Sequence, residues 1–138
     1  MTTAGYSGTP LPRKLGIGSG ARILLARRPA GFDLGSLPPD VTVHSRRTAP
    51  VYEVILGFCP DSRTLAREWP RWHESTTPAG AVCIRWPKRT SGMPTDLTDA
   101  VVRDYGLAHG RVDVKVCAVD ERWSGLKFVV RLRDRPRN

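Results

Sequence analysis

The sequence has no hydrophobic run long enough to cross a membrane, and it has few residues that could cross-link a fold. A membrane-spanning helix needs about 20 apolar residues, and the start of the chain lacks the basic and apolar regions of a secretory signal. The three cysteines, Cys59, Cys83 and Cys117, lie in or beside apolar runs without metal-ligand spacing. We therefore expect a cytoplasmic protein with no membrane segment, no disulfide framework and no metal site.

A glycine-rich cofactor turn is also missing from the place where a nucleotide-binding fold needs it. The apolar run Ile23 to Leu25 predicts a strand over 22–26 that is buried on both faces. In nucleotide-binding α/β proteins a glycine turn follows such a strand and approaches the phosphates. Here the glycines lie before the strand, at 16–20, and Arg27 and Arg28 follow it. The pattern predicts a Rossmann-like scaffold without the usual cofactor signature.

Positive charge is abundant. The 138 residues carry 22 Lys and Arg against 13 Asp and Glu, for a formal net charge of +9. The length suits one α/β domain over 1–138, with 1–8 and 134–138 expected to be flexible. The charge favours an anionic small molecule, an acidic protein segment or nucleic acid as partner, although scattered arginines are also typical of a solvated surface.

Hydrophobic periodicity predicts alternating strands and helices that end in a hairpin. Strands are expected at 22–26, 41–44, 52–59, 81–86, 112–119 and 126–132. A short helix is expected at 9–15, whereas 32–39 is too rich in Pro and Gly for a long helix. One long helix starts at Asp61 or Ser62 and is kinked or restarted at Pro70. Another is capped at Thr95 and Asp96. Their predicted buried sides are Leu65, Trp69 and Trp72, and Leu97, Val101 and Tyr105.

The order of elements from Tyr52 to Leu132, with a last strand that returns antiparallel, resembles the C-terminal half of class I S-adenosylmethionine-dependent methyltransferases. The resemblance implies a compact, truncated, mostly parallel Rossmann-like sheet with a C-terminal antiparallel hairpin. The glycine motif of that family is absent. Arg46 and Arg47 follow the second strand, where an acidic residue would hold ribose hydroxyls. No cofactor-binding residues are carried over, and the cofactor stays unknown.

Three sequence blocks resemble a family of small bacterial proteins defined as a domain of unknown function. The blocks lie at 5–17, 86–98 and 113–127 and together cover nearly the whole chain. The resemblance implies a bacterial cytoplasmic protein without an established activity, and it supplies no catalytic residues.

The candidate site lies where the carboxyl ends of the strands meet, because ligands of open parallel sheets bind there. The loop 86–98 brings two cations, hydroxyl groups and the start of a helix, whose N–H groups attract anions. Two tryptophans could stack on a planar group. In the alternative interpretation, Asp96 caps the following helix, and Asp96 or Asp120 pairs with Lys88. The candidate ligand-binding residues are Arg27, Arg28, Trp86, Lys88, Arg89, Ser91, Asp120 and Trp123.

Three functions follow from this site. The leading hypothesis is a non-catalytic binding or regulatory module that holds an anionic ligand or an acidic partner in the basic cleft. The second is a divergent S-adenosylmethionine-type group-transfer enzyme, although no His, Cys or Ser has a sequence neighbour that predicts a triad, and only Cys59 leaves a redox or nucleophilic role open. The third is nucleic-acid binding through Arg27, Arg28, Arg46, Arg47 and the C-terminal arginines.

Overall fold

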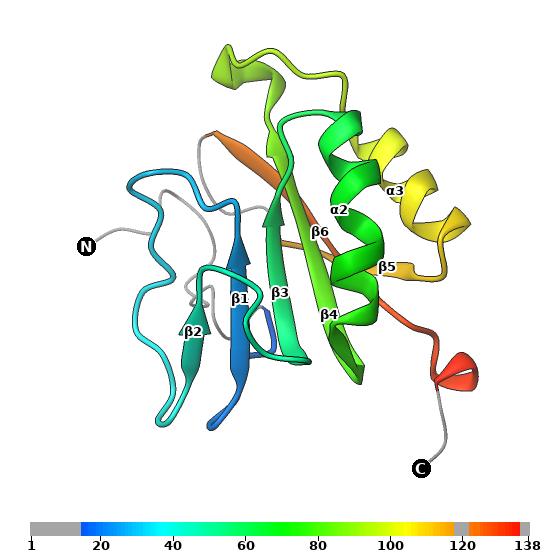
Figure 1. The fold of residues 1–138 in the computed structure, drawn as a ribbon. Coiled ribbons are helices and arrows are strands. Elements are labelled where there is room, and N and C mark those ends of the chain that lie inside the picture. Colours follow the sequence, from blue (N-terminus) through cyan, green and yellow to red (C-terminus); the bar gives the residue numbers. More distant parts are fainter. Residues whose placement is uncertain (1–14, 118–121, 136–138) are drawn as a thin grey trace.

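A computed structural model describes residues 15–117 and 122–135, which form one mixed six-stranded sheet with two α-helices (Figure 1). The sheet order is β2-β1-β3-β4-β6-β5. The strands are β1 (Arg22–Ala26), β2 (Thr42–His44), β3 (Tyr52–Phe58), β4 (Thr76–Pro87), β5 (Val112–Val116) and β6 (Trp123–Val129).

The predicted α/β class is confirmed, and the sheet is parallel in part. The pairs β1–β2, β1–β3 and β3–β4 are parallel. Strand β6 is antiparallel to both of its neighbours, β4 and β5. The predicted C-terminal hairpin is therefore present, and its returning strand lies between β4 and β5 in the sheet.

The strand boundaries agree with the prediction at β1 and differ most at β4 and β6. Strand β4 begins at Thr76 rather than at Ala81, because Thr76 already pairs with the start of β3. Strand β6 begins at Trp123 rather than at Leu126, because its register with β4 starts at Pro87. The expected helix at 9–15 lies, except for its last residue, outside the described residues. So do the expected flexible end at 1–8 and the last three residues of the one at 134–138, whereas Asp134 belongs to a short 3-10 helix, η2 (Leu132–Asp134).

Helix α2 (Ser62–Glu74) continues through Pro70, so the predicted restart at the proline is wrong. Pro70 lies on the exposed side of the helix, while Trp69 and Trp72 beside it are buried against the sheet. Packing of these two rings, one before and one after the proline, stabilises a continuous helix. Tertiary burial here outweighs the loss of one backbone hydrogen bond at the proline.

Helix α3 (Asp99–Ala108) begins later than predicted, with Thr98 as its N-cap instead of Thr95 or Asp96. The Val101 amide donates to Thr98 Oγ1 over 3.2 Å. The side of this helix that packs on the sheet carries Val102 and Gly106, so Val102 is buried and Val101 is 42% exposed. The predicted burial of Val101 is therefore wrong.

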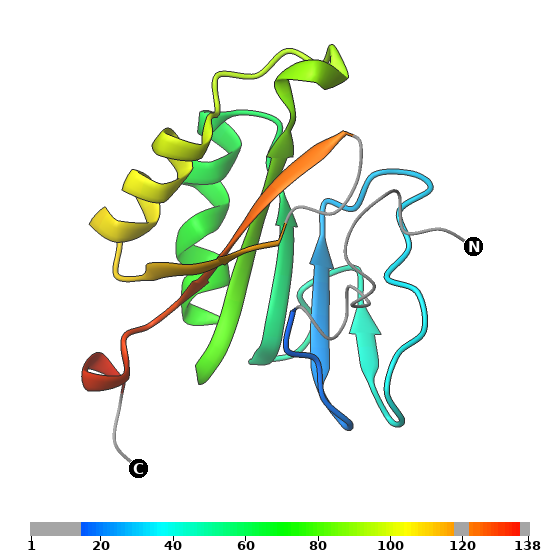
Figure 2. The ribbon, with the colours of Figure 1, turned by 180° about the vertical axis from the view of Figure 1, so that it is seen from behind.

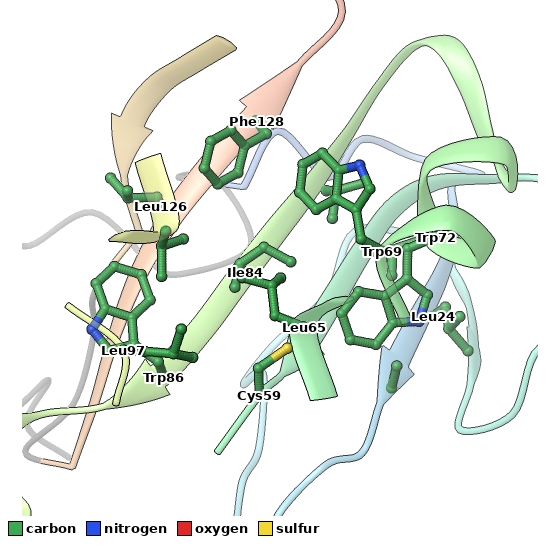
Figure 3. Packing of buried hydrophobic residues seen from close by; sticks show 14 of the residues in the cluster. Leu24, Cys59, Leu65, Trp69, Trp72, Ile84, Trp86, Leu97, Leu126 and Phe128 are labelled. Carbon is green, nitrogen blue, oxygen red and sulfur yellow. The ribbon is translucent and has the colours of Figure 1, made fainter. Parts of the chain in front are cut away.

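Both helices lie on one face of the sheet, where they enclose a core rich in tryptophan (Figure 3). Two glycines allow this close packing. A Cβ atom at Gly57 on β3 would lie 2.3 Å from the ring of Trp72, and one at Gly106 on α3 would lie 2.2 Å from the ring of Phe128. The indole of Trp69 meets Phe128 edge to face, with ring centroids 5.5 Å apart.

Among the described residues, the segments that cover the opposite face, 15–21 and 27–41, are irregular chain rather than helices (Figure 2). A second core cluster lies on this face. In it, Leu15, Ile17 and Leu34 of these segments pack with the side chains of β1 and β3 that point away from the helices. The β1–β2 connection, residues 27–41, contains no helix, as its proline and glycine content predicts.

A disulfide joins Cys83 on β4 to Cys117 at the end of β5, so the prediction of three unlinked cysteines is wrong. Strand β6 lies between these two strands, and Gly125 on β6 leaves the space that the bridge needs. A Cβ atom at Gly125 would lie 3.0 Å from Cys117 Sγ. The sequence hides this pairing, because it depends on the order of the strands in the sheet.

Candidate functional site

A cavity of about 440 Å³ opens beside the carboxyl end of β4. This volume lies within the range of roughly 300–1,000 Å³ that small-molecule sites occupy. Its walls come from the end of β4, the β4–α3 loop, the first turn of α3 and the start of β6. The lining residues are Trp86, Pro87, Lys88, Arg89, Met93, Pro94, Thr95, Leu97, Thr98, Asp99 and Ser124.

The cavity combines an apolar wall with a cationic rim. Trp86 and Leu97 are buried and belong to the helix-side core, and Trp86 lies opposite Ser124 in the β4–β6 register. Lys88 and Arg89 contribute the positive charges, and Arg89 is exposed. The one acidic member, Asp99, forms an i,i+4 ion pair with Arg103, which also pairs with Asp113, so the lining keeps two cations against one carboxylate. The cavity is therefore suited to an anion with an apolar body.

Local hydrogen bonds fix the shape of the β4–α3 loop. A short 3-10 helix, η1 (Arg89–Ser91), follows β4 and ends at Gly92, whose φ of +79° favours glycine. The Ser91 hydroxyl donates to the Lys88 carbonyl over 2.7 Å and accepts from the Met93 amide over 3.1 Å. Ser91 thus stabilises the loop and is not among the residues that line the cavity.

The loop is also attached to the neighbouring elements. The Lys88 amide donates to the Arg122 carbonyl over 2.7 Å, which joins the loop to the start of β6. Asp96 accepts from both the amide and the hydroxyl of Ser62, at the start of α2. These hydrogen bonds hold the pKa of Asp96 below its usual value. The expectation that Asp96 caps its own helix is wrong, because Thr98 occupies that position and Asp96 reaches the other helix.

The structure separates the predicted site residues into three places. Trp86, Lys88 and Arg89 line the cavity. Arg27 follows β1 with φ of +60°, and its guanidinium lies 3.7 Å from the carboxylate of Glu68 on α2. Arg28 is exposed beside it, and neither arginine lines the cavity.

Trp123 lies on the opposite side of the sheet from Trp86, so the two indoles cannot hold one planar ligand. Its ring packs edge to face on Phe58, with centroids 5.1 Å apart, in the cluster under the irregular chain. The register explains the separation: Trp123 pairs with Pro87, one position beyond Trp86, and successive strand residues face opposite sides. Asp120 lies outside the described residues.

Sequence reasoning missed two parts of this region. The lining contributed by Met93, Pro94 and Ser124 has no chemical motif, and only the strand register reveals Ser124. Arg85 was also missed. It is fully buried on the other face of β4, where its guanidinium carbon lies 5.4 Å from the ring centroid of Phe32 and 5.3 Å from that of Phe58. Side chains along a strand alternate between the two faces of the sheet, so the sequence pattern of β4 could have placed Arg85 on the face opposite Trp86.

Cys59, the one cysteine whose sequence position leaves a redox or nucleophilic role open, is part of the core. Cys59 is buried next to Leu65 (Figure 3). Burial raises the pKa of its thiol to about 12, although the nearby Arg27 acts in the opposite direction. Because the thiolate is the reactive form, Cys59 is unsuited to act as a nucleophile at neutral pH.

The histidines hold structural hydrogen bonds. His44 Nδ1 lies 2.8 Å from the hydroxyl of Tyr52, and His109 Nδ1 lies 2.7 Å from the Tyr105 carbonyl. His73 Nδ1 accepts from Arg111 Nε over 2.9 Å. Burial first, and then the charge of Arg111, lower the pKa of His73.

Arg111 itself is buried and has a pKa of about 10, lowered by burial. It also donates to the carbonyls of His73, Gly80 and Phe128. This network joins the end of α2 to β4 and β6. The arrangement supports the fold rather than a reaction.

The described residues contain no group of three or more His, Cys, Asp or Glu side chains placed to hold a metal ion. Within the same part of the chain, no helix has the length and hydrophobicity that a membrane crossing requires.

Comparison with protein-family models and with curated protein sequences finds no match. Among solved structures, the fold is similar to that of TrmN from Thermus thermophilus, a tRNA methyltransferase, with a TM-score of 0.53 and 13% sequence identity. The match covers 87% of this chain and 47% of TrmN, so the chain spans about half of that protein's length. The comparison supports a methyltransferase-like fold. The resemblance to the small bacterial family stays a prediction.

S-adenosylmethionine, the cofactor that this fold implies, does not fit the residues after β1 and β2. Arg27 and Arg28 follow β1 directly, and Glu68 of α2 lies against Arg27. After β2, His44 is hydrogen-bonded to Tyr52, and the exposed Arg46 follows instead of a carboxylate that could hold ribose hydroxyls. Arginines therefore occupy the position after β1 where the cofactor site has a glycine-rich turn. After β2, a hydrogen-bonded histidine and an arginine occupy the position where that site has a carboxylate.

Proposed function

We propose that this protein is a binding module that holds a small organic anion in the cavity at the end of β4. One observation carries the proposal: Lys88 and Arg89 form a cationic rim next to the apolar wall of Trp86 and Leu97, around a cavity of about 440 Å³. A phosphate or carboxylate group would contact the rim, and an aromatic or aliphatic body would contact the wall. The alternative occupant of the cavity is an acidic segment of a partner protein.

The test compares ligand-induced stabilisation of two double variants with equal changes in charge. K88A/R89A removes the rim, and R131A/R133A removes two exposed arginines near the C-terminal end of the described chain. The probes are AMP, pyrophosphate and 4-hydroxybenzoate. A probe at one hundred times its dissociation constant stabilises the native state by about 2.7 kcal/mol, which raises the melting temperature measurably. We expect that increase in the wild type and in R131A/R133A, and its loss in K88A/R89A.

Failure of all three probes, or equal loss in both variants, contradicts the proposal. If an acidic peptide raises the melting temperature through Lys88 and Arg89 and no small anion does, the occupant is a protein segment.

We further propose that the chain is a shortened methyltransferase-like sheet that has lost the cofactor site. The strand order and the similarity to TrmN support the topology. The residues after β1 and β2 argue against the cofactor. Adding S-adenosylmethionine or its demethylated product is therefore expected to leave the melting temperature unchanged. A saturable increase with either compound would restore the group-transfer hypothesis. A bacterial origin and a cytoplasmic location remain part of the proposal.

A further inference from the structure

The outer side of α2 carries a row of arginines. Arg63, Arg67 and Arg71 recur at intervals of four residues, and all three are exposed. Four residues advance about 6 Å along a helix axis, so the row extends over about 12 Å. Helix α2 faces the viewer in Figure 1, on the outer surface of the sheet.

Two further arginines extend this row at its sides. Arg47, in the β2–β3 connection, donates to the hydroxyl of Ser75 at the C-cap of α2 over 3.1 Å. Arg27, after β1, lies 3.7 Å from Glu68 on α2. We call Arg27, Arg47, Arg63, Arg67 and Arg71 the arginine face.

The stability of the fold does not account for the arginine face. Like charges four residues apart on a helix repel each other, and Arg63 stands in the first turn, where the helix dipole disfavours a cation. Glu68 lies close to Arg27 and Arg67 and is mostly buried. Arg63 and Arg71 form no salt bridge with any residue that the structure describes. The charges of Arg63 and Arg71 are therefore available for an intermolecular contact, whereas Arg27, Arg47 and Arg67 also hold contacts within the fold.

The chemistry of this surface selects one class of partner. Its exposed side offers no large apolar residue, since Leu65, Trp69 and Trp72 are buried in the core, so it cannot insert into a lipid surface. Guanidinium groups bind phosphate oxygens in a bidentate manner, and a row of them matches the repeated phosphates of a nucleic-acid strand. We infer that the arginine face binds the phosphodiester backbone of a nucleic acid, with α2 lying along the strand.

The experiment measures binding of fluorescently labelled oligonucleotides between 50 and 200 mM salt. The probes are a single-stranded RNA, its RNA duplex and the DNA duplex of the same sequence, which show whether the backbone bound is RNA or DNA. The variant R63Q/R71Q removes the two arginines without an ion pair, and R22Q/R122Q, at two exposed arginines outside the arginine face, is the control with the same net charge. Each lost phosphate contact lowers the slope of log affinity against log salt by about 0.9 on duplex DNA and about 0.7 on a single strand.

We expect wild type and R22Q/R122Q to bind with steep salt dependence. R63Q/R71Q should lose about tenfold or more in affinity and about 1.4–1.8 in slope. Its melting temperature should change little, because within the fold Arg63 and Arg71 act only through long-range attraction, to Asp61 and to the C-terminal end of the α2 dipole. The inference is overturned if the two variants weaken binding equally, if no probe binds, or if poly-glutamate binds the face as tightly as nucleic acid. These outcomes leave the Lys88 and Arg89 experiment unaffected, so the two proposals can fail separately.

Discussion

Opening the Cys83–Cys117 disulfide is expected to remove a large part of the stability of this protein. The bridge joins residues separated by 34 positions. In the chain-entropy description, closing a loop stabilises by about 3 kcal/mol for 15 residues and about 4.7 kcal/mol for 100 residues, so this loop corresponds to roughly 4 kcal/mol. Folded domains of this kind are stable by only about 5–15 kcal/mol. The melting temperature should therefore fall by roughly 8–16 °C.

The assay is urea unfolding with and without a dithiol reductant, on the wild type and on two variants. C83A/C117A should match the reduced wild type and should not respond to reductant. C59A removes the buried cysteine that has no disulfide, so it should show a small cavity cost and retain the full response to reductant. Thiol titration of the denatured protein should give one thiol before reduction and three after it. Three thiols before reduction, or an unfolding midpoint that reductant does not move, would refute the reasoning.

Two further predictions test the core. Stability should decline as the pH falls below about 6.5, the ordinary pKa of His73, because burial and Arg111 lower that pKa in the fold and the unfolded histidine binds the proton more readily. Urea midpoints between pH 8 and pH 5 measure this loss, and H73Q should flatten the curve. Gly57→Ala should destabilise by about 1–3 kcal/mol, because its Cβ would clash with Trp72, whereas Gly18→Ala, which meets nothing within 4 Å, should be nearly neutral in thermal melts.

The sequence was sufficient for those parts of the fold that depend on local pattern. The apolar run at 22–26 gives β1 with its observed ends, and the alternation predicted over 112–119 gives the start of β5, which ends at Val116. The proline and glycine content of 32–39 correctly predicts a connection without a helix. In each case one short segment carries its own signal, because strand burial and turn chemistry are set by neighbouring residues.

What the sequence could not give depends on how distant segments meet. The Cys83–Cys117 bridge needs β6 to lie between β4 and β5, and the cavity needs Ser124 opposite Trp86. Register also separates Trp123 from Trp86, although Trp86 lies near the end of β4 and Trp123 at the start of the neighbouring strand β6. The basic character of the loop after β4 was visible from Lys88 and Arg89. The four-residue spacing of Arg63, Arg67 and Arg71 is also visible in the sequence, but a charged row on the exposed side of a helix does not by itself indicate a partner.

The uneven cover of the two faces of the sheet has a consequence for how the molecule opens. Regular helices protect one side, while residues 15–21 and 27–41 protect the other with irregular chain. Segments with few backbone hydrogen bonds open locally at a small part of the global free energy. Amide hydrogens of these two segments should therefore exchange with solvent well before those of β3 and β4. Leu15, Leu34 and Phe32 would then be uncovered together, in molecules whose helical side is still intact.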